Sequence, residues 1–215
     1  MPAGRPLRGL DALARDVRAC RICRDEPSPR ALPHEPRPVL RVSSRARIAV
    51  CGQAPGTRVH ASGVPFTDPS GDRLRGWMGV TVAEFYDADR IAIVPMGFCF
   101  PGLDAKGGDL PPRRECATVW HARLFALMPR IELFLLVGLY AQAWHLDAQE
   151  PPSLSDTVAD WRRYSGATQT RTHAGVHVFP LPHPSWRNNA WLKARPWFEV
   201  ELLPELQQQV RSLLS

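Results

Sequence analysis

Four short apolar runs constrain the fold of this chain more than any other feature of its sequence. They cover residues 47–51, 90–94, 131–137 and 176–181. Each has the length of a β-strand and is rich in β-branched or aromatic residues, without the strict alternation of a half-exposed strand. Continuous apolar runs of this length are typical of strands that are buried on both faces of a parallel sheet. The runs therefore predict the central strands of an α/β domain.

Helical patterns lie between or after these runs, at residues 115–128, 139–145 and 197–214. The alternation of strands and helices, joined by right-handed crossovers, predicts a three-layer α/β domain. Apolar residues at helical spacing predict one more amphipathic helix over residues 7–19. The Pro- and Arg-rich stretch that follows, to residue 38, reads as an irregular connection. Residues 151–175 are polar and predict a long surface excursion.

The 215 residues and the 44% hydrophobic content fit one domain better than two. We expect an N-terminal helix and a cysteine pair in residues 1–40, and the core in residues 41–215. No run approaches eighteen consecutive apolar residues, and the N-terminal residues lack the apolar stretch of a secretory signal. We therefore expect a cytoplasmic monomer without a membrane partner.

The chain is basic, with a formal net charge of +6 and an isoelectric point near 9.5. Phosphate contacts from basic side chains supply most of the sequence-independent affinity for nucleic acids, so this charge favours a polyanionic partner. However, 25 of the 27 basic residues are arginine. That bias is equally consistent with codon usage in a GC-rich genome.

Distinctive residues follow three of the predicted strands. The first strand leads into Gly52-Gln53-Ala54-Pro55-Gly56, the second approaches Cys99, and the fourth ends in Pro182-His183-Pro184-Ser185. In open α/β sheets, ligands bind beyond the carboxyl ends of the strands. These segments are therefore expected to meet at one edge of the sheet and to form a site there.

The cysteines suggest a metal centre rather than a disulfide framework, because the expected compartment keeps thiols reduced. Cys20 and Cys23 are spaced so that both bind one centre from a single turn, and Cys99 and Cys116 follow later. Four thiolates suit a tetrahedral zinc ion or a [4Fe-4S] cluster, and the ligand set alone does not separate the two. A chance grouping of cysteines is the third reading. Cys51 ends an apolar run and is expected to be a small buried hydrophobe.

Five segments together resemble the uracil-DNA glycosylase superfamily, in particular its iron-sulfur branches, families four and five. They occur in the family order and extend from about residue 18 to the C-terminus. The segments are Cys20-Arg21-Ile22-Cys23, Gly52-Gln53-Ala54-Pro55-Gly56, Gly63-Val64-Pro65-Phe66-Thr67-Asp68-Pro69-Ser70-Gly71, Cys99 with Cys116, and His183-Pro184-Ser185. The resemblance implies an α/β/α sandwich around a four-stranded parallel sheet. It also implies a [4Fe-4S] cluster, structural in role, held by the four cysteines.

The resemblance further implies an enzyme that hydrolyses the N-glycosidic bond of uracil in DNA. Such an enzyme flips the nucleotide into a pocket and stabilises the departing base anion. His183 is expected to donate a hydrogen bond to uracil O2, and Phe66 to stack on the ring. The expected substrate-binding residues are Gly52, Gln53, Ala54, Pro55, Gly56, Phe66 and Met96. The expected DNA-binding residues are Ser185, Trp186, Arg187 and Asn188, with Trp186 or Arg187 entering the gap left by the base.

Two positions depart from the family pattern. The best-known branch has an Asp that orients the attacking water where this chain has Ala54, so we expect His60 or Asp68 to handle the water. Many relatives read the uracil edge with an Asn where this chain has Pro95. Backbone groups of Met96 and Gly97 are the nearest substitutes, followed by two carboxylates of the same loop, Asp104 and Asp109. These departures leave open a DNA-binding protein with altered specificity or lost turnover, and a zinc-stabilised protein that only mimics the motifs.

Overall fold

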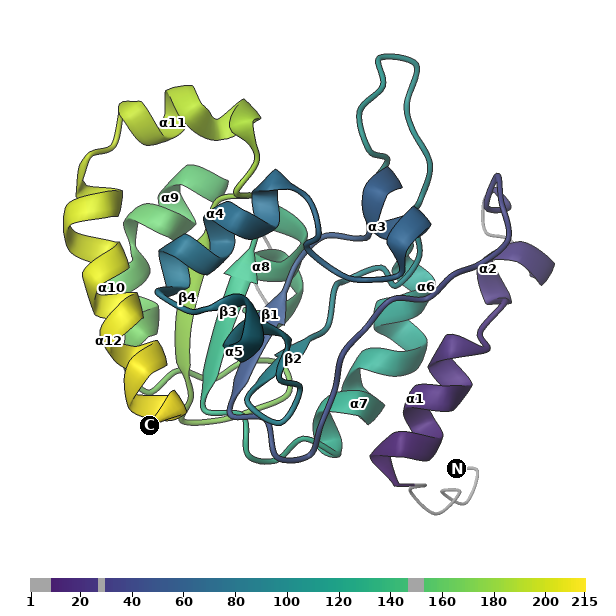
Figure 1. Ribbon diagram of the computed structural model, residues 1–215, viewed down its shortest axis with the longest axis horizontal. Coiled ribbons are helices and arrows are strands. Elements are labelled where there is room, and N and C mark those ends of the chain that lie inside the picture. The colour runs from purple at the N-terminus through teal and green to yellow at the C-terminus, as the bar shows by residue number, and fades with distance from the viewer. Residues whose placement is uncertain (1–8, 27–29, 147–152) are drawn as a thin grey trace.

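A four-stranded parallel sheet forms the centre of the computed structural model, which describes residues 9–26, 30–146 and 153–215. The strands, in the spatial order β2-β1-β3-β4, are β1 (Ile48–Cys51), β2 (Ile91–Ile93), β3 (Leu133–Val137) and β4 (His177–Leu181). Every neighbouring pair is parallel, and each strand lies within one of the four apolar runs. The predicted α/β fold with four parallel strands is confirmed (Figure 1).

Side chains that alternate along the strands point into two separate hydrophobic cores. In β3, Phe134 and Leu136 belong to the first core, whereas Leu133, Leu135 and Val137 belong to the second. All five are fully buried, which explains why this run shows no polar alternation. A sheet with two buried faces needs helices on both sides, and Figure 1 shows them there.

The first core is covered by α1, α7 and α8. Their bounds are Leu10–Arg18, Ala122–Ala126 and Leu139–His145. The helix predicted over residues 139–145 coincides with α8, and the one over 7–19 is confirmed from Leu10 onward. Residues 7 and 8 lie outside the described part of the chain. Past α1, the short helix α2 (Ile22–Asp25) begins within the cysteine pair.

The helix predicted over residues 115–128 is confirmed, with a local irregularity. It begins as α6 (Arg114–Cys116), passes through a π-helical turn (Ala117–His121) and continues as α7. Its buried residues, among them Leu124 and Phe125, belong to the first core. Turns of this kind are frequent near functional sites, and this one directly follows Cys116.

The second core is covered by α4, α5, α9, α10 and the C-terminal helix α12. The first two are Pro69–Met78 and Val82–Tyr86. The helix predicted over residues 197–214 appears as a π-helical segment (Phe198–Leu202) that continues into α12 (Leu203–Leu214). Within the described residues, no helix is long and apolar enough to cross a membrane.

The surface excursion predicted over residues 151–175 is wrong. Two short helices, α9 (Leu154–Ala159) and α10 (Trp161–Ser165), occupy much of this segment. Val158 and Trp161 are buried in the second core, and the Trp161 ring stacks on Phe179 of β4 with the centroids 5.8 Å apart. Each of these short helices has only a few apolar residues, and polar residues surround them in the sequence. The apolar residues therefore show no clear helical periodicity. Residues 151 and 152 lie outside the described chain.

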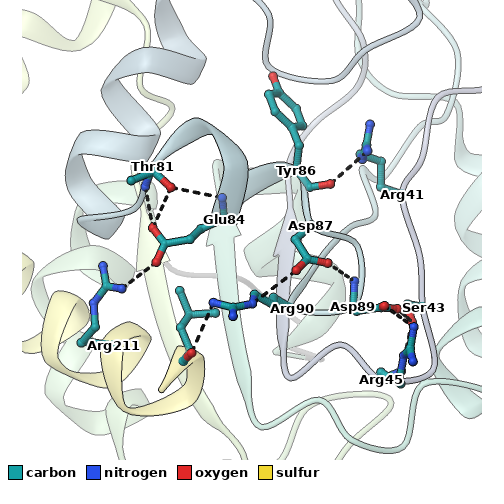
Figure 2. A network of polar contacts seen from close by, with 11 residues as sticks. Arg41, Ser43, Arg45, Thr81, Glu84, Tyr86, Asp87, Asp89, Arg90 and Arg211 are labelled. Atoms are coloured by element: carbon teal, nitrogen blue, oxygen red, sulfur yellow. Dashed lines mark hydrogen bonds and ion pairs between the residues drawn. The ribbon is translucent and has the colours of Figure 1, made fainter.

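A polar network fastens α12 to α5 (Figure 2). The Thr81 hydroxyl accepts a hydrogen bond from the Glu84 N–H at 3.2 Å, and the Glu84 carboxylate accepts one from the Thr81 N–H at 2.8 Å. The Glu84 carboxylate also accepts a hydrogen bond from Arg211 Nη1 at 2.7 Å. The hydrogen bonds to the carboxylate, of which the one from the Thr81 N–H has the largest effect, lower the pKa of Glu84 to about 2. Their contribution to stability is therefore fully present above the ordinary glutamate pKa, and it is lost as the pH falls from there through the folded-state pKa of about 2.

Replacing Thr81 with alanine is expected to lower the free energy of unfolding by about 1 kcal/mol, because it removes the N-cap of α5. The measurement is urea unfolding followed by circular dichroism. Thr118→Ala is the matched control, since the exposed Thr118 hydroxyl only donates to the carbonyl of Arg114 in its own helix. Equal losses in the two variants would contradict a capping role for Thr81.

Candidate active site

Two adjoining cavities lie at the carboxyl edge of the sheet, between the segments that follow β1 and β4. The inner cavity has a volume of about 70 Å³, and the outer cleft has one of about 610 Å³. Six residues line both: Gln53, Ala54, Asp68, Ser70, Asp109 and His183. The segments after β1 and β4 thus meet as the sequence predicts, and they share a small enclosed space that opens into a larger one.

The loop from Gly52 to Gly56 forms one wall of the inner cavity. It follows β1 and leads directly into α3 (Thr57–Ser62). The carbonyl of Gly52 accepts a hydrogen bond from the Met96 N–H at 2.8 Å, and the carbonyl of Gln53 accepts one from the Gly97 N–H at 2.9 Å. These two bonds brace the loop against the segment that follows β2.

The same bonds correct the expected role of Met96 and Gly97. Their N–H groups are already committed to the loop, so they are not available to read the edge of a base. The buried Met96 side chain lies in the first core and lines neither cavity. Pro95 does line the inner cavity, but its carbonyl faces away, within 3.1 Å of His121 Nε2.

Phe66 is held in a strained conformation at the inner cavity. Its φ of 56° is one that residues with a side chain rarely adopt. The Phe66 carbonyl accepts hydrogen bonds from Arg75 Nη1 at 3.2 Å and from the Tyr86 hydroxyl at 3.1 Å. The Phe66 carbonyl also packs closely on Gly71, because a Cβ on Gly71 would lie 1.9 Å from the carbonyl oxygen of Phe66. Strain maintained by such contacts is typical of functional sites.

The ring of Phe66 points toward the loop after β1. Its tip lies 3.4 Å from the position that a Cβ on Gly52 would occupy. A Cβ at this distance would be in van der Waals contact with the ring, so the loop and the ring lie side by side at the inner cavity. The ring is partly exposed and also meets Phe85 edge-on, with the centroids 5.9 Å apart. The expected stacking residue is therefore in place beside the cavity.

His183 follows β4, and its side chain lines both cavities. The Asn188 side-chain amide donates a hydrogen bond to the His183 carbonyl at 2.7 Å, which fixes the backbone of the turn. Burial lowers the pKa of the imidazole, although Asp68 and Asp109 oppose this shift. A lowered pKa keeps the ring neutral near pH 7, and a neutral imidazole donates from one nitrogen.

His60 does not reach either cavity, which corrects its expected role in handling water. Its ring packs against His34 at a centroid distance of 4.1 Å and against Phe100 at 5.9 Å. The His60 carbonyl accepts a hydrogen bond from Arg37 Nη1 at 2.7 Å. His60 of α3 therefore belongs to a cluster of packed rings with His34 and Phe100.

Asp68 and Asp109 are the two carboxylates of the site. Asp68 caps α4 and was expected from the sequence, and it lines both cavities. Asp109 comes from the long loop between β2 and α6, which rises above α3 in Figure 1. From the sequence, Asp109 was a candidate only for reading the edge of the base. The sequence of a loop does not show which of its carboxylates points into the site. Burial raises the pKa of the Asp109 carboxyl.

The segment from Ser185 to Asn188, for which we expect contact with DNA, forms the rim of the outer cleft. Trp186 is 73% exposed, and the Arg187 guanidinium lies 5.8 Å from the centroid of its ring. Two arginines that sequence reasoning missed, Arg58 of α3 and Arg73 of α4, line the same cleft. Arg73 also donates a hydrogen bond to the carbonyl of Ser185 at 3.1 Å. The cleft thus carries positive charge on two sides, and α11 (Asn189–Lys193) follows the rim.

The four cysteines assigned to one centre lie together. Cys20, Cys23, Cys99 and Cys116 line one small cavity of about 10 Å³ with apolar neighbours, and the last three are buried. The Phe98 N–H donates a hydrogen bond to Cys116 Sγ at 3.5 Å. Among the described residues, however, no group of three or more His, Cys, Asp or Glu side chains is arranged to hold a metal ion. Cys51 lies apart, fully buried in the first core, and burial raises the pKa of its thiol.

A comparison with protein-family models assigns most of this chain to a known family. The model of the uracil DNA glycosylase superfamily matches residues 41–207. The matched region includes the sheet, the outer cleft with its rim, every lining residue of the inner cavity except Val39, and Cys99 and Cys116. Cys20 and Cys23 precede it.

Proposed function

Because this chain belongs to the uracil DNA glycosylase superfamily, we propose that it is a DNA glycosylase that excises uracil and leaves an abasic site. One observation carries the proposal. Phe66 and His183 line the same inner cavity, and that cavity adjoins a cleft with arginines on its walls. The first space suits a flipped base, and the second suits the strand from which the base comes.

The chemistry required of the site is the cleavage of the bond between the sugar carbon C1′ and uracil N1. As this bond breaks, negative charge moves onto the base and positive charge onto the sugar. A neutral His183 would donate a hydrogen bond to uracil O2, and this bond becomes stronger as the charge on the base grows. Phe66 would stack on the ring and hold its plane, a contact worth about 0.5–1.5 kcal/mol beyond the buried area.

DNA binding would rest on the outer cleft. Arg58 and Arg73 are placed on its walls and Arg187 on its rim, where guanidinium groups can neutralise phosphates on both sides of the flipped nucleotide. Trp186 is the most exposed large apolar side chain of the described chain. It would fill the gap in the base stack, because an inserted apolar wedge replaces the stacking that the flipped base gives up.

We also propose that the four cysteines bind a [4Fe-4S] cluster. Their meeting in one small cavity supports a shared centre, and four thiols are the usual ligand set for such a cluster. A zinc ion is the competing occupant, because it accepts the same four ligands. The cluster would supply structural support rather than a chemical step, because its ligands surround a cavity that shares no residue with the inner cavity.

A DNA-binding protein with lost turnover or altered lesion specificity is the second candidate function. Ala54 and Pro95 favour it, since both replace polar side chains that many relatives use. A labelled oligonucleotide with a single uracil separates the two candidates, because excision leaves an alkali-sensitive abasic site and free uracil. We expect strand cleavage after alkali at the uracil position alone. Tight binding without release of any base would support the second candidate.

A further inference from the structure

We propose that Asp109 is the carboxylate that activates the attacking water. This inference rests on the proposed glycosylase function and adds to it a residue role. The chain carries Ala54 at the position where the best-known branch orients the water, and the methyl group of alanine cannot accept a proton. Ala54 and Asp109 line the same two cavities, so a carboxylate from another loop is available at this place.

The loop that carries Asp109 is folded back as a hairpin. Leu103 and Asp109 form an antiparallel bridge, and the Leu110 N–H donates to the Gly102 carbonyl at 2.9 Å. At the tip, the Asp104 carboxylate accepts hydrogen bonds from the N–H groups of Lys106 and Gly108, both at 2.8 Å. The hairpin therefore has a defined shape, and it fixes the direction in which Asp109 points.

The Asp109 carboxylate lies against the loop that follows β1. Its Oδ2 is 3.5 Å from the position that a Cβ on Gly56 would occupy, which is an ordinary van der Waals distance and places the carboxylate beside this loop. Within the part of the chain that the structure describes, neither oxygen of Asp109 accepts a hydrogen bond. Both lone-pair sets thus remain available for a water molecule in the cavity.

Asp68 is less suited to this task. Its Oδ1 accepts hydrogen bonds from the Ser70 N–H at 3.1 Å and the Gly71 N–H at 3.2 Å, and a short one from the Ser70 hydroxyl. These bonds stabilise the start of α4 and occupy one oxygen of the carboxylate. Asp68 therefore acts mainly as a helix cap, and its nearby charge helps to raise the pKa of Asp109.

The charged groups around Asp109 come from three segments. His183 and Arg187 follow β4, Asp68 precedes α4, and Arg58 of α3 lines the same cleft. His183 and Arg187 favour the ionised carboxylate, whereas burial and Asp68 oppose it, and the pKa is raised. A carboxylate with a raised pKa is a better proton acceptor than an ordinary aspartate.

The proposed step balances without a further reactant. The water oxygen forms a bond to C1′ while the bond between C1′ and N1 breaks, and the electron pair of that bond leaves with uracil. One proton of the water moves to Asp109, and it later passes to the uracil anion. The products are an abasic sugar and neutral uracil, and Asp109 returns to its ionised form.

The test is single-turnover cleavage of a uracil oligonucleotide by the full-length Asp109→Asn variant. We expect its rate to fall about a hundredfold, the lower end of what a general base contributes, because a largely dissociated transition state needs little help from a base. Asp11→Asn is the control, because Asp11 is an exposed aspartate of α1 that lines neither cavity, and it should keep the wild-type rate. Asp109→Glu should recover part of the loss.

A pH profile separates catalysis from a structural effect. The wild-type rate should rise with pH through the raised pKa of Asp109, and this rise should be absent in Asp109→Asn. A near wild-type rate for Asp109→Asn, or an unchanged rise with pH, would overturn the inference while the glycosylase function stands. If the wild-type chain itself cleaves no uracil, the proposed function fails first and the inference fails with it.

Discussion

The His183→Ala variant is expected to excise uracil about a hundredfold to a thousandfold more slowly than the wild-type chain, the usual loss for one preorganised donor. The physical reason is that the hydrogen bond to the base strengthens only as the bond to the sugar breaks. His183 is placed for this task because it lines both cavities and burial keeps its imidazole neutral. Single-turnover cleavage of a uracil oligonucleotide gives the rate directly.

DNA affinity should change little in the His183→Ala variant, because the arginines of the outer cleft are unaltered. His60→Ala is the matched control, since His60 is a partly buried histidine that reaches neither cavity. It should cleave at the wild-type rate. Cleavage by His183→Ala at a near wild-type rate would remove this residue from the mechanism.

Replacing Cys99 or Cys116 with serine is expected to abolish folding, and activity is lost only as a consequence. Both cysteines are buried in the region that links the N-terminal segment to the loop after β2. That loop braces the wall of the inner cavity through the N–H groups of Met96 and Gly97. A centre that binds all four thiols would therefore support the wall of the inner cavity through this loop. The wild-type protein should be brown and contain about four irons per chain.

Circular dichroism and iron analysis of the purified variants test this expectation. Cys51→Ala is the matched control, because Cys51 is a buried cysteine outside the group of four, and it should keep the iron and the colour. A colourless wild-type protein with one zinc per chain would contradict the cluster. A cluster-free Cys99 variant that stays folded and loses only catalysis would contradict its structural role.

The sheet could be predicted from the sequence because its strands are buried on both faces. The run that became β3 is apolar at every position from Leu133 to Val137, and no other element of this length suits two hydrophobic cores. The short helices α9 and α10 could not be predicted in the same way. Only a few residues of each, such as Val158 and Trp161, contact the core, which is too few to establish a helical period.

The site was predictable where its residues follow strands. The loop at Gly52 and the turn at His183 are placed by the ends of β1 and β4, whose direction the sequence pattern already gives. The positions of Asp109 and Met96 were harder to predict, because both residues lie in loops. The hairpin turns Asp109 into the cleft, whereas hydrogen bonding to Gly52 takes up the Met96 N–H, and neither event leaves a periodic signal.

In the proposed glycosylase, the range of excised bases would depend on the inner cavity. Val39, Ile93 and Pro95 give part of this cavity an apolar wall, and the Gln53 amide is among the polar groups that remain. A site that pairs with the polar edge of a base rejects analogues far better than an apolar pocket does. We therefore expect uracil to be the main substrate. We also expect hypoxanthine and xanthine to be rejected less strongly than in relatives that carry Asn at the position of Pro95.

Single-turnover rates on oligonucleotides that each carry one uracil, hypoxanthine, xanthine or thymine test the central claim most directly. We expect uracil to be excised fastest, hypoxanthine and xanthine to be excised slowly but measurably, and thymine to remain intact. Excision of hypoxanthine as fast as that of uracil would contradict the assignment of uracil as the substrate. If no base is released from any of the four oligonucleotides, the chain is not a glycosylase of these lesions.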